Sequence, residues 1–270
     1  MHIIVLIKEV PDMEKVRFDT ERGVIDRKSA GTEVNPFDLN ALEAAVQLKE
    51  LLGAKVTALC MGPSQAEKSL KEALSRGADE ALLLSDSAFG GSDTWATSRT
   101  LAAAIRKLGD WDAIFAGEKT VDGDTGQVGA QVAQLLALPL ISYVETLNWH
   151  QATGLSAEVS LWDGLYRKSV AGKALFTFTK TANTPRLPGV RDKMKARKAQ
   201  IPCWKLADLA GYLEASQTGF SGSPTKVKKI VIPPAPQRQG NCYRDALPQA
   251  LEQVDRLLQS SHLITQEVKA

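Results

Sequence analysis

The residues best suited to chemistry gather in one glycine-rich stretch, residues 117–129, which follows an apolar run and precedes a helical pattern. Four glycines surround the expected start of that helix: Gly117, Gly123, Gly126 and Gly129. Backbone amides at such a helix start can hold a phosphate group, and the helix dipole assists them. Thr125 and Gln127 add side chains that can donate hydrogen bonds. Glycine-rich turns also join ordinary strands to helices, so a phosphate site and a plain turn both stay open.

Other familiar reaction centres are missing from the sequence. Asp122 opens a stretch similar to a calcium loop, but Gly126, Gln127 and Ala133 stand where an EF-hand needs a ligand, a glycine and a distal glutamate. No Gly-x-Gly-x-x-Gly follows the first apolar run, and the chain has no Walker lysine motif. Its three histidines and three cysteines show no zinc spacing. We therefore expect a nucleotide site without a catalytic acid, base or nucleophile.

The elements that would position the glycine-rich stretch alternate between strands and helices. Buried strands are predicted at four apolar runs: 3–7, 55–61, 80–84 and 112–116. Asn35 followed by Pro36 predicts a helix start with Asn35 as its capping residue. Such alternation indicates a parallel sheet with right-handed crossovers, which binds ligands at the carboxyl ends of its strands. These segments are expected at that crevice: 8–12, 35–38, 61–63 and 117–129.

The pattern changes in the middle of the chain. The segments 155–161 and 166–170 flank Asp163 and Gly164, a pair typical of tight turns, and they predict an antiparallel hairpin. A further strand is predicted at 174–179. The first part of the chain is therefore expected to be an α/β fold, a Rossmann-like parallel sheet of the adenine-nucleotide-binding type with an added antiparallel hairpin.

The composition shifts again at about Ala182, where the chain becomes rich in Pro, Gly, Lys and Arg. This shift predicts an extended C-terminal arm with one helix at 245–258. Such an arm buries little by itself, so we expect it to wrap another subunit. The predicted domains are a nucleotide- or flavin-binding α/β domain at 1–182 and the arm at 183–270.

One stiff segment of the arm could dock a partner protein. Leu187 stands between Arg186 and Pro188, and the basic run 191–198 follows it. An apolar anchor surrounded by charge is typical of a transient binding site, because the anchor gives affinity and the charges raise the association rate. A solvated basic loop is the alternative interpretation.

Composition narrows the class of protein. The chain has 270 residues with a net charge of +2, which is far from the basic balance of a nucleic-acid-binding domain. Its apolar runs are too short to cross a bilayer, and its first residues lack the features of a signal peptide. The cysteines are few, odd in number and far apart: Cys60, Cys203 and Cys242. They suit a reducing compartment, so we expect a cytoplasmic protein without membrane insertion.

A series of short motifs, in order, resembles the β-subunits of electron-transfer flavoproteins over nearly the whole chain. The motifs are Ile7-Lys8-x-Val10-Pro11-Asp12, Asn35-Pro36-Phe37-Asp38, Met61-Gly62-Pro63, Arg76-Gly77-Ala78-Asp79, Asp122-Gly123-Asp124-Thr125-Gly126-Gln127-Val128-Gly129, Pro185-Arg186-Leu187-Pro188 and Gly222-Ser223-Pro224-Thr225. The form of residues 122–129, and the stretch Ser85-Asp86-x-x-Phe89-Gly90-Gly91-x-Asp93, look like the electron-bifurcating branch. Members of that branch attached to lactate or acyl-CoA dehydrogenases are particularly similar.

The resemblance implies a heterodimer with an electron-transfer flavoprotein α-subunit. In the bifurcating branch the β-subunit holds FAD, accepts hydride from NADH and divides the electrons between ferredoxin or flavodoxin and a flavin-dependent dehydrogenase. The subunit would then be part of an NAD-dependent bifurcating complex of anaerobic metabolism. In simple carriers the same site holds structural AMP. A nucleotide-binding regulatory module is the alternative from another class.

Carried over residue by residue, the resemblance assigns cofactor contacts to the strand ends and to the glycine-rich loop. They are Leu6, Asn35, Pro36, Phe37, Asp38, Met61, Gly117, Asp122, Gly123, Asp124, Thr125, Gly126, Gln127 and Val128. Partner docking falls to Arg186, Leu187 and Pro188. The protein would supply orientation and electrostatics while the flavin does the chemistry.

Overall fold

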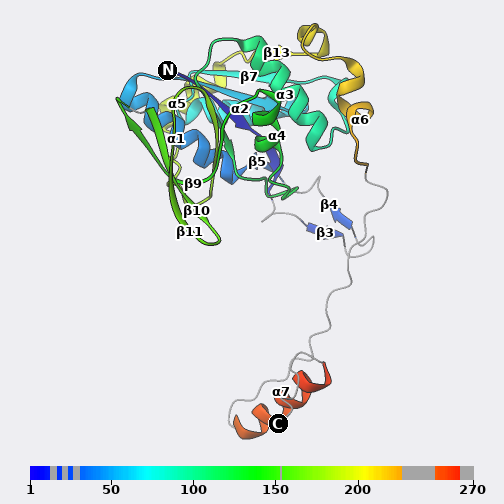
Figure 1. Cartoon of the computed structure of the whole chain (residues 1–270). Helices are drawn as coiled ribbons and strands as arrows, with labels where there is room; N and C mark the ends of the chain where they lie inside the picture. The colour runs from blue at the N-terminus through cyan, green and yellow to red at the C-terminus, as the bar shows by residue number, and fades with distance from the viewer. Residues whose placement is uncertain (13–16, 20–23, 27–30, 153, 227–246, 262–270) are drawn as a thin grey trace. The chain divides into compact units, whose positions relative to one another are not determined.

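The computed structural model describes residues 1–12, 17–19, 24–26, 31–152, 154–226 and 247–261. The chain divides into two compact units, Met1–Ile230 and Val231–Ala270, drawn in Figure 1. The first unit contains the central sheet and every segment that the sequence assigned to a cofactor site.

The central sheet has nine described strands in the order β11-β10-β9-β12-β8-β1-β6-β7-β13. Their bounds are β1 His2–Ile7, β6 Lys55–Met61, β7 Glu80–Leu84, β8 Ala113–Gly117, β9 Leu140–His150, β10 Gly154–Leu161, β11 Gly164–Val170, β12 Ala174–Phe178 and β13 Cys203–Trp204. Only β9–β10 and β10–β11 pair antiparallel, and they form the meander at the end of the sheet visible in Figure 1. Two small antiparallel pairs are separate: β2 Glu9–Pro11 with β5 Thr32–Val34, and β3 Arg17–Asp19 with β4 Val24–Asp26. The predicted fold class is confirmed.

Helices cover both faces of the sheet (Figure 1). Their bounds are α1 Pro36–Leu52, α2 Glu67–Ser75, α3 Thr94–Leu108, α4 Val128–Leu135, α5 Val190–Lys198 and α6 Gly219–Gly222. Alternate residues of β1 enter two hydrophobic clusters: Ile3 packs in the cluster of Leu42 from α1, whereas Ile4 packs in that of Ile105 from α3. This alternation follows from the period-two geometry of a strand that is buried on both faces.

The order of the strands places a ligand crevice at β1. The chain runs from β1 through α1 to β6 on one side, and it later returns through α3 to β8 on the other side. Both neighbours pair parallel with β1. The helices that follow β1 and β8 pack on opposite faces, since Leu42 of α1 and Val132 of α4 lie in different hydrophobic clusters. Such a switch point is where open α/β sheets bind ligands.

The structure contains elements that the sequence reading did not anticipate. β9 inserts beside β12 although no strand was expected at 140–150. The basic run after Leu187 forms α5, which packs on α2 and buries Ala196, instead of staying extended. β13 then pairs with β7, and Leu209 lies in the hydrophobic core. Lys, Arg, Met and Ala are good helix formers, so the composition of this run favours a helix. The sequence interpretation considered only its charge.

The second unit contains one described helix, α7, at Leu247–Ser260. It is close to the predicted helix at 245–258. None of its residues is buried. Its larger apolar side chains are exposed and recur at helical spacing: Leu247, Leu251, Val254 and Leu257. An apolar stripe of this kind is normally covered in a folded assembly.

Candidate functional site

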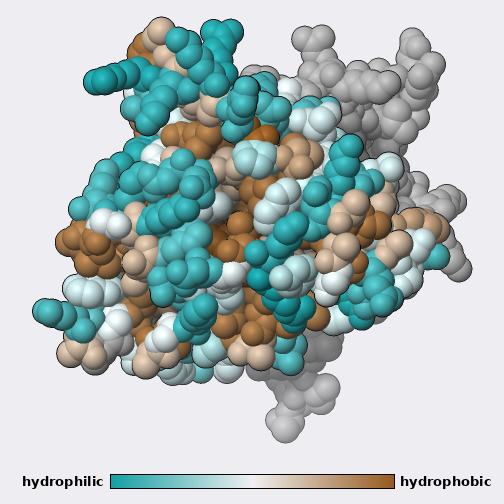
Figure 2. Space-filling model, turned by 90° about the horizontal axis from the view of Figure 1, so that it is seen from above, coloured by the Kyte–Doolittle hydropathy of each residue, from teal (hydrophilic) through white to brown (hydrophobic). Residues whose placement is uncertain are grey.

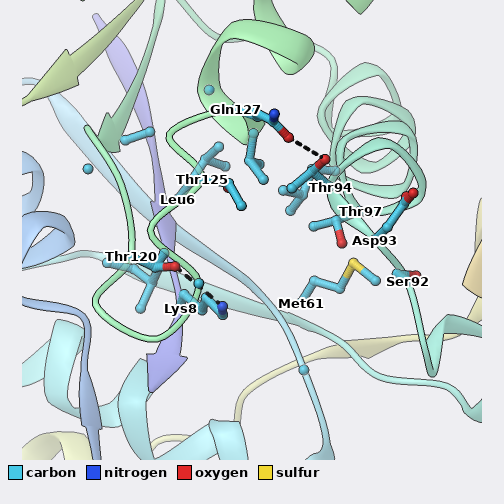
Figure 3. A pocket seen from close by; sticks show the side chains of 18 of the residues that line it. Leu6, Lys8, Met61, Ser92, Asp93, Thr94, Thr97, Thr120, Thr125 and Gln127 are labelled. Carbon is cyan, nitrogen blue, oxygen red and sulfur yellow. Dashed lines mark hydrogen bonds between the residues drawn. The ribbon is translucent and has the colours of Figure 1, made fainter. Parts of the chain in front are cut away.

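A cavity of about 710 Å³ lies at the carboxyl ends of β1, β6 and β8. Figure 3 shows its two walls: Lys8 and Thr120 on one side, and Asp93, Thr94 and Thr97 on the other. Its apolar lining includes Leu6, Leu59, Met61, Phe89, Leu101 and Ala116. Cavities of this volume with an apolar lining and a few polar groups are typical of cofactor sites.

The glycine-rich loop forms the first wall and presents the start of α4 to the cavity. Gln127 occupies the N-cap position without a side-chain hydrogen bond to the first turn of the helix. Its Oε1 instead accepts a hydrogen bond of 2.9 Å from the Thr94 hydroxyl on the other wall. The first amides of α4 have no acceptor within the helix, and Val128 and Gly129 line the cavity. This is the arrangement that binds phosphate groups.

Backbone conformation explains two residues of this loop. Gly126 has φ +61°, in the left-handed region that favours glycine. Asp124 also has a positive φ, of 51°, and its amide donates to the Thr120 carbonyl over 2.8 Å. Short polar residues tolerate this region better than other non-glycine residues. The loop therefore folds as a tight turn, and Gly123, Thr125 and Gly126 of this turn line the cavity.

Two ion pairs and the buried side-chain amide of Asn35 hold the glycine-rich loop in place. Lys8 Nζ lies 2.7 Å from the Asp122 carboxylate, and Lys119 Nζ lies 2.9 Å from that of Asp124. Although partial burial acts in the opposite direction, the hydrogen bond from Lys8 holds the pKa of Asp122 below its ordinary value. Asn35 Nδ2 donates to the Lys119 carbonyl over 2.9 Å, and Asn35 Oδ1 accepts from the Val121 amide. Asn35 occupies the N-cap position of α1 and Pro36 begins the helix, as predicted, but the Asn35 side chain supports the loop and makes no capping hydrogen bond.

Asp38 ties the ends of β1 and β8 to the start of α1. Its carboxylate accepts hydrogen bonds from the Lys8 amide at 2.8 Å, Asn35 Nδ2 at 2.9 Å and the Gly117 amide at 3.2 Å. Burial raises the pKa of Asp38 to about 7, although these three donors favour the charged form. A Cβ at Gly117 would lie 2.4 Å from Asp38 Oδ1, and 2.7 Å from Phe37 Cβ. Only glycine permits this close approach.

The second wall comes from residues that the sequence reading did not place at the site. Asp93 Oδ1 caps α3 by accepting from the amides of Trp95 and Ala96, both at 3.0 Å. Asp93 Oδ2 accepts from the Thr225 amide at 2.9 Å and from its hydroxyl at 2.7 Å. The wall residues missed are Asp86, Phe89, Gly90, Gly91, Ser92, Asp93, Thr94, Thr97 and Thr225. The glycine pair before a helix-capping aspartate was the available signal, since such turns allow close approach of a ligand.

The structure brings most of the expected contact residues together. Those that line the cavity are Leu6, Asp38, Met61, Gly117, Gly123, Thr125, Gly126, Gln127 and Val128. The others stand behind the lining: Asn35, Pro36, Phe37, Asp122 and Asp124. Pro36 is the first residue of α1, and Phe37 packs under Gly117. These residues support the loops, and their direct contact with a cofactor stays a prediction.

The expected docking segment lies on the outside of the helical layer. Leu187 is 87% exposed. Arg186 is not free, because its Nε lies 2.8 Å from Glu43 and its Nη2 lies 3.0 Å from Glu50, both on α1. Its carbonyl also accepts a hydrogen bond from Arg76, the residue that follows α2. The segment is therefore held rigid, with the leucine side chain turned out to solvent.

The described residues contain no group of three or more His, Cys, Asp or Glu arranged to hold a metal ion. Among the described helices, none combines the length and the apolar composition that crossing a bilayer requires. The face seen in Figure 2 mixes hydrophilic and hydrophobic residues instead of showing a continuous apolar band.

Comparison with known proteins places this chain among electron transfer flavoproteins. Residues 22–209 match the model of the electron transfer flavoprotein domain. The chain is 39% identical to the electron transfer flavoprotein subunit beta of Thermoanaerobacterium thermosaccharolyticum, over 98% of this chain and 100% of that one. It is 42% identical to the caffeyl-CoA reductase-Etf complex subunit CarD of Acetobacterium woodii, covering 87% and 89% of the two chains. It is 40% identical to protein FixA of Azorhizobium caulinodans, covering 87% and 85%.

Proposed function

The chain belongs to the electron transfer flavoprotein family as a β-subunit, and from this premise we propose that its cavity binds FAD and accepts electrons from NADH. In this proposal the αβ heterodimer bifurcates electrons, or confurcates them in reverse, between ferredoxin or flavodoxin and a partner dehydrogenase. The subunit itself binds and orients the cofactor and the redox partners.

The observation that carries the proposal is the depth of the cavity beyond the phosphate site. The start of α4 and residues 117–126 can hold an adenosine phosphate at the first wall. The space continues past Met61 to the second wall, where Phe89 and Leu101 add apolar surface. AMP is only one part of FAD, so AMP would leave the second wall without a ligand. A flavin ring fits an apolar surface bordered by the small residues Gly90 and Gly91.

The residues at the site suit hydride transfer. FAD, when bound, supplies the redox chemistry: it takes two electrons and one proton from NADH as a hydride and leaves NAD⁺. Hydride transfer needs stacking and an open face, and no acid or base from the protein. Among the charged lining residues, Lys8 is paired with Asp122, Lys119 is paired with Asp124, and Asp38 accepts from three donors. They are available to hold the loops rather than to exchange protons with a substrate.

Two surfaces are proposed for protein partners. Leu187, held by Arg186, is the proposed anchor for a flavin-dependent dehydrogenase of the lactate or acyl-CoA type. The name of the relative CarD, a subunit of a caffeyl-CoA reductase-Etf complex, favours the acyl-CoA type. Of the predicted arm after residue 182, the part beyond the first unit, with α7, is proposed to wrap the α-subunit. We place the complex in the cytoplasm, where a chain with these scattered cysteines would stay reduced.

The test is a count of cofactors in the purified αβ complex. The complex should release two FAD per αβ pair, and NADH without any dehydrogenase should bleach one of them. One FAD and one AMP per pair, with no oxidation of NADH, would instead assign the protein to the simple carriers. That outcome would contradict the proposal and leave the family membership intact.

A further inference from the structure

Glu118 is an acidic residue of the cavity lining whose charge is not compensated. The other acidic residues of the lining are Asp38, Asp86 and Asp93. Asp38 accepts from three donors, Asp86 accepts from two backbone amides, and Asp93 accepts from three. Among the residues that the structure describes, none makes a hydrogen bond or an ion pair with the Glu118 carboxylate. The half-buried Glu118 therefore carries its charge without a direct partner.

The backbone of Glu118 is fixed beside the glycine-rich loop. The residue directly follows β8, and its amide donates to the Phe178 carbonyl on β12 over 2.9 Å. Its own carbonyl oxygen would lie 3.6 Å from a Cβ on Gly126. Glu118 is thus part of the wall at which the loop and the start of α4 suit a phosphate group.

The charged groups around Glu118 add to this imbalance. Partial burial raises the pKa of Glu118, and the carboxylates of Asp124 in the loop and Glu145 on β9 act in the same direction. Lys119 favours the charged form, but its ammonium group lies 2.9 Å from Asp124 and is paired with it. An acidic group with a raised pKa therefore stands next to the proposed site for an anion.

A bound phosphate should change the protonation of this group. Like charges repel more strongly in a partly buried site than in water, because the effective dielectric constant is lower there. A phosphate group at the start of α4 would therefore favour the neutral form of a neighbouring carboxyl group.

We propose that Glu118 binds a proton from solvent when the phosphate groups of the cofactor occupy the glycine-rich loop, so that pH controls how tightly the β-subunit holds its cofactor. The proton returns to solvent when the cofactor leaves. The inference rests on the proposed function only for the presence of a phosphate group at this loop, and FAD and AMP both have one.

The experiment measures the Kd of the bound cofactor from pH 5 to pH 8, by dilution of the αβ complex and ultrafiltration of the nucleotide released. Glu118→Gln keeps the shape of the side chain and removes its charge. Between pH 5 and pH 8 the Kd of wild type should rise about tenfold more than that of Glu118→Gln, the order of magnitude expected for two charges that interact in a protein. At pH 8 the variant should hold the cofactor more tightly than wild type. Loss of a structural contact would not produce such a gain.

Glu145→Gln is the matched control, because Glu145 faces Glu118 but does not line the cavity, and its Kd should keep the pH dependence of wild type. Asp38 lines the cavity and has a pKa of about 7, but it is present in wild type and in Glu118→Gln and does not affect their comparison.

The same pH dependence in wild type and Glu118→Gln would overturn the inference, and so would weaker binding by Glu118→Gln at pH 8. The released nucleotide is identified in the same experiment. AMP in place of FAD would contradict the proposed function, while the difference between wild type and variant would still support the inference.

Discussion

Gly126 is the residue whose backbone the proposed phosphate site depends on most. Its φ of +61° is costly for any residue with a Cβ, by roughly 1–2 kcal/mol, and more for a β-branched one. The added atom itself has room, since it would lie 3.6 Å from the Glu118 carbonyl oxygen. Strain, and not collision with the protein, therefore decides the effect of a substitution.

Gly126→Val should relax the turn and shift the backbone of a loop that lines the cavity. We expect bound nucleotide to fall by about 5- to 30-fold, the factor that 1–2 kcal/mol represents, with the fold intact by circular dichroism. The measurement is nucleotide released per chain by acid. Gly109→Val is the control, because Gly109 has a similar φ of +79° and open space around its Cβ but does not line the cavity. A full complement of cofactor in Gly126→Val would show that the loop is not the phosphate site.

Asp38 should make the complex less stable as pH rises, whereas a carboxyl group with a lowered pKa makes a protein more stable as pH rises. Burial raises its pKa from 3.8 to about 7, so between pH 4 and 7 the folded state retains a proton that the unfolded state has lost. Its contribution to the free energy of unfolding therefore falls as pH rises through this window, on the order of a few kcal/mol, and is level above pH 7. Asp38→Asn should remove this dependence.

The measurement is denaturant unfolding of the αβ complex from pH 5 to pH 8, compared between wild type and variant. The difference in free energy of unfolding between wild type and Asp38→Asn should change with pH up to pH 7 and then stay constant. Asp122→Asn is the control, because Lys8 lowers the pKa of Asp122, so its carboxyl titrates below this range. If this difference in free energy of unfolding is independent of pH, Asp38 does not titrate near pH 7 in the folded state.

At the scale of elements, α1 and α2 jointly position the docking segment before α5. Arg186 contacts Glu43 and Glu50 on α1, while Arg76, at the C-terminal end of α2, donates to the Arg186 carbonyl. The segment is thus preorganised, and Leu187 can enter a partner without further ordering. The positive charges of α5 beside it favour a partner with an acidic rim around an apolar pocket.

Leu187→Ala should lower kcat/KM with the partner dehydrogenase about tenfold, because the side chain acts as a buried anchor in the complex. FAD content and reduction by NADH should be unchanged, since the residue lies outside the cavity lining. Leu51→Ala is the control, as Leu51 is a similarly exposed leucine, at 69%, on α1. Equal kcat/KM values for the two variants would remove Leu187 from the docking site.

At the scale of the whole molecule, α7 presents an apolar stripe that no described residue of its own unit covers. Leu247, Leu251, Val254 and Leu257 are between 49% and 71% exposed. An amphipathic helix of this kind binds by laying its apolar face in a groove of a partner. In our proposal that partner is the α-subunit, and the β-chain expressed alone should aggregate.

Leu251→Asp should weaken assembly of the heterodimer, because it places a charge in the centre of the stripe. The measurement is the amount of α-subunit that copurifies with tagged β-subunit, with helix content followed by circular dichroism. Gln249→Asp adds the same charge on the opposite side of α7 and should leave assembly unchanged. Normal assembly of Leu251→Asp would exclude α7 as an α-subunit contact.

The alternation of apolar runs and helical patterns determined the parallel sheet, because buried strands and crossover helices leave strong local signals. The first wall could also be predicted, since Gly117, Gly126 and the start of α4 are close in the sequence as well as in space. Leu187 was recognised as exposed because prolines flank it. In each case neighbouring residues carry the information.

Only the tertiary structure decided the second wall and the roles of the supporting residues. Asp93 meets Thr225 across 132 positions, and Arg186 meets Glu43 across 143, so no local pattern could reveal either contact. Asn35 is a residue type that often caps helices, but the Val121 amide lies close enough to donate to its side-chain oxygen instead. Where several partners compete for one polar group, long-range packing selects among them, and the sequence alone states only which partners are possible.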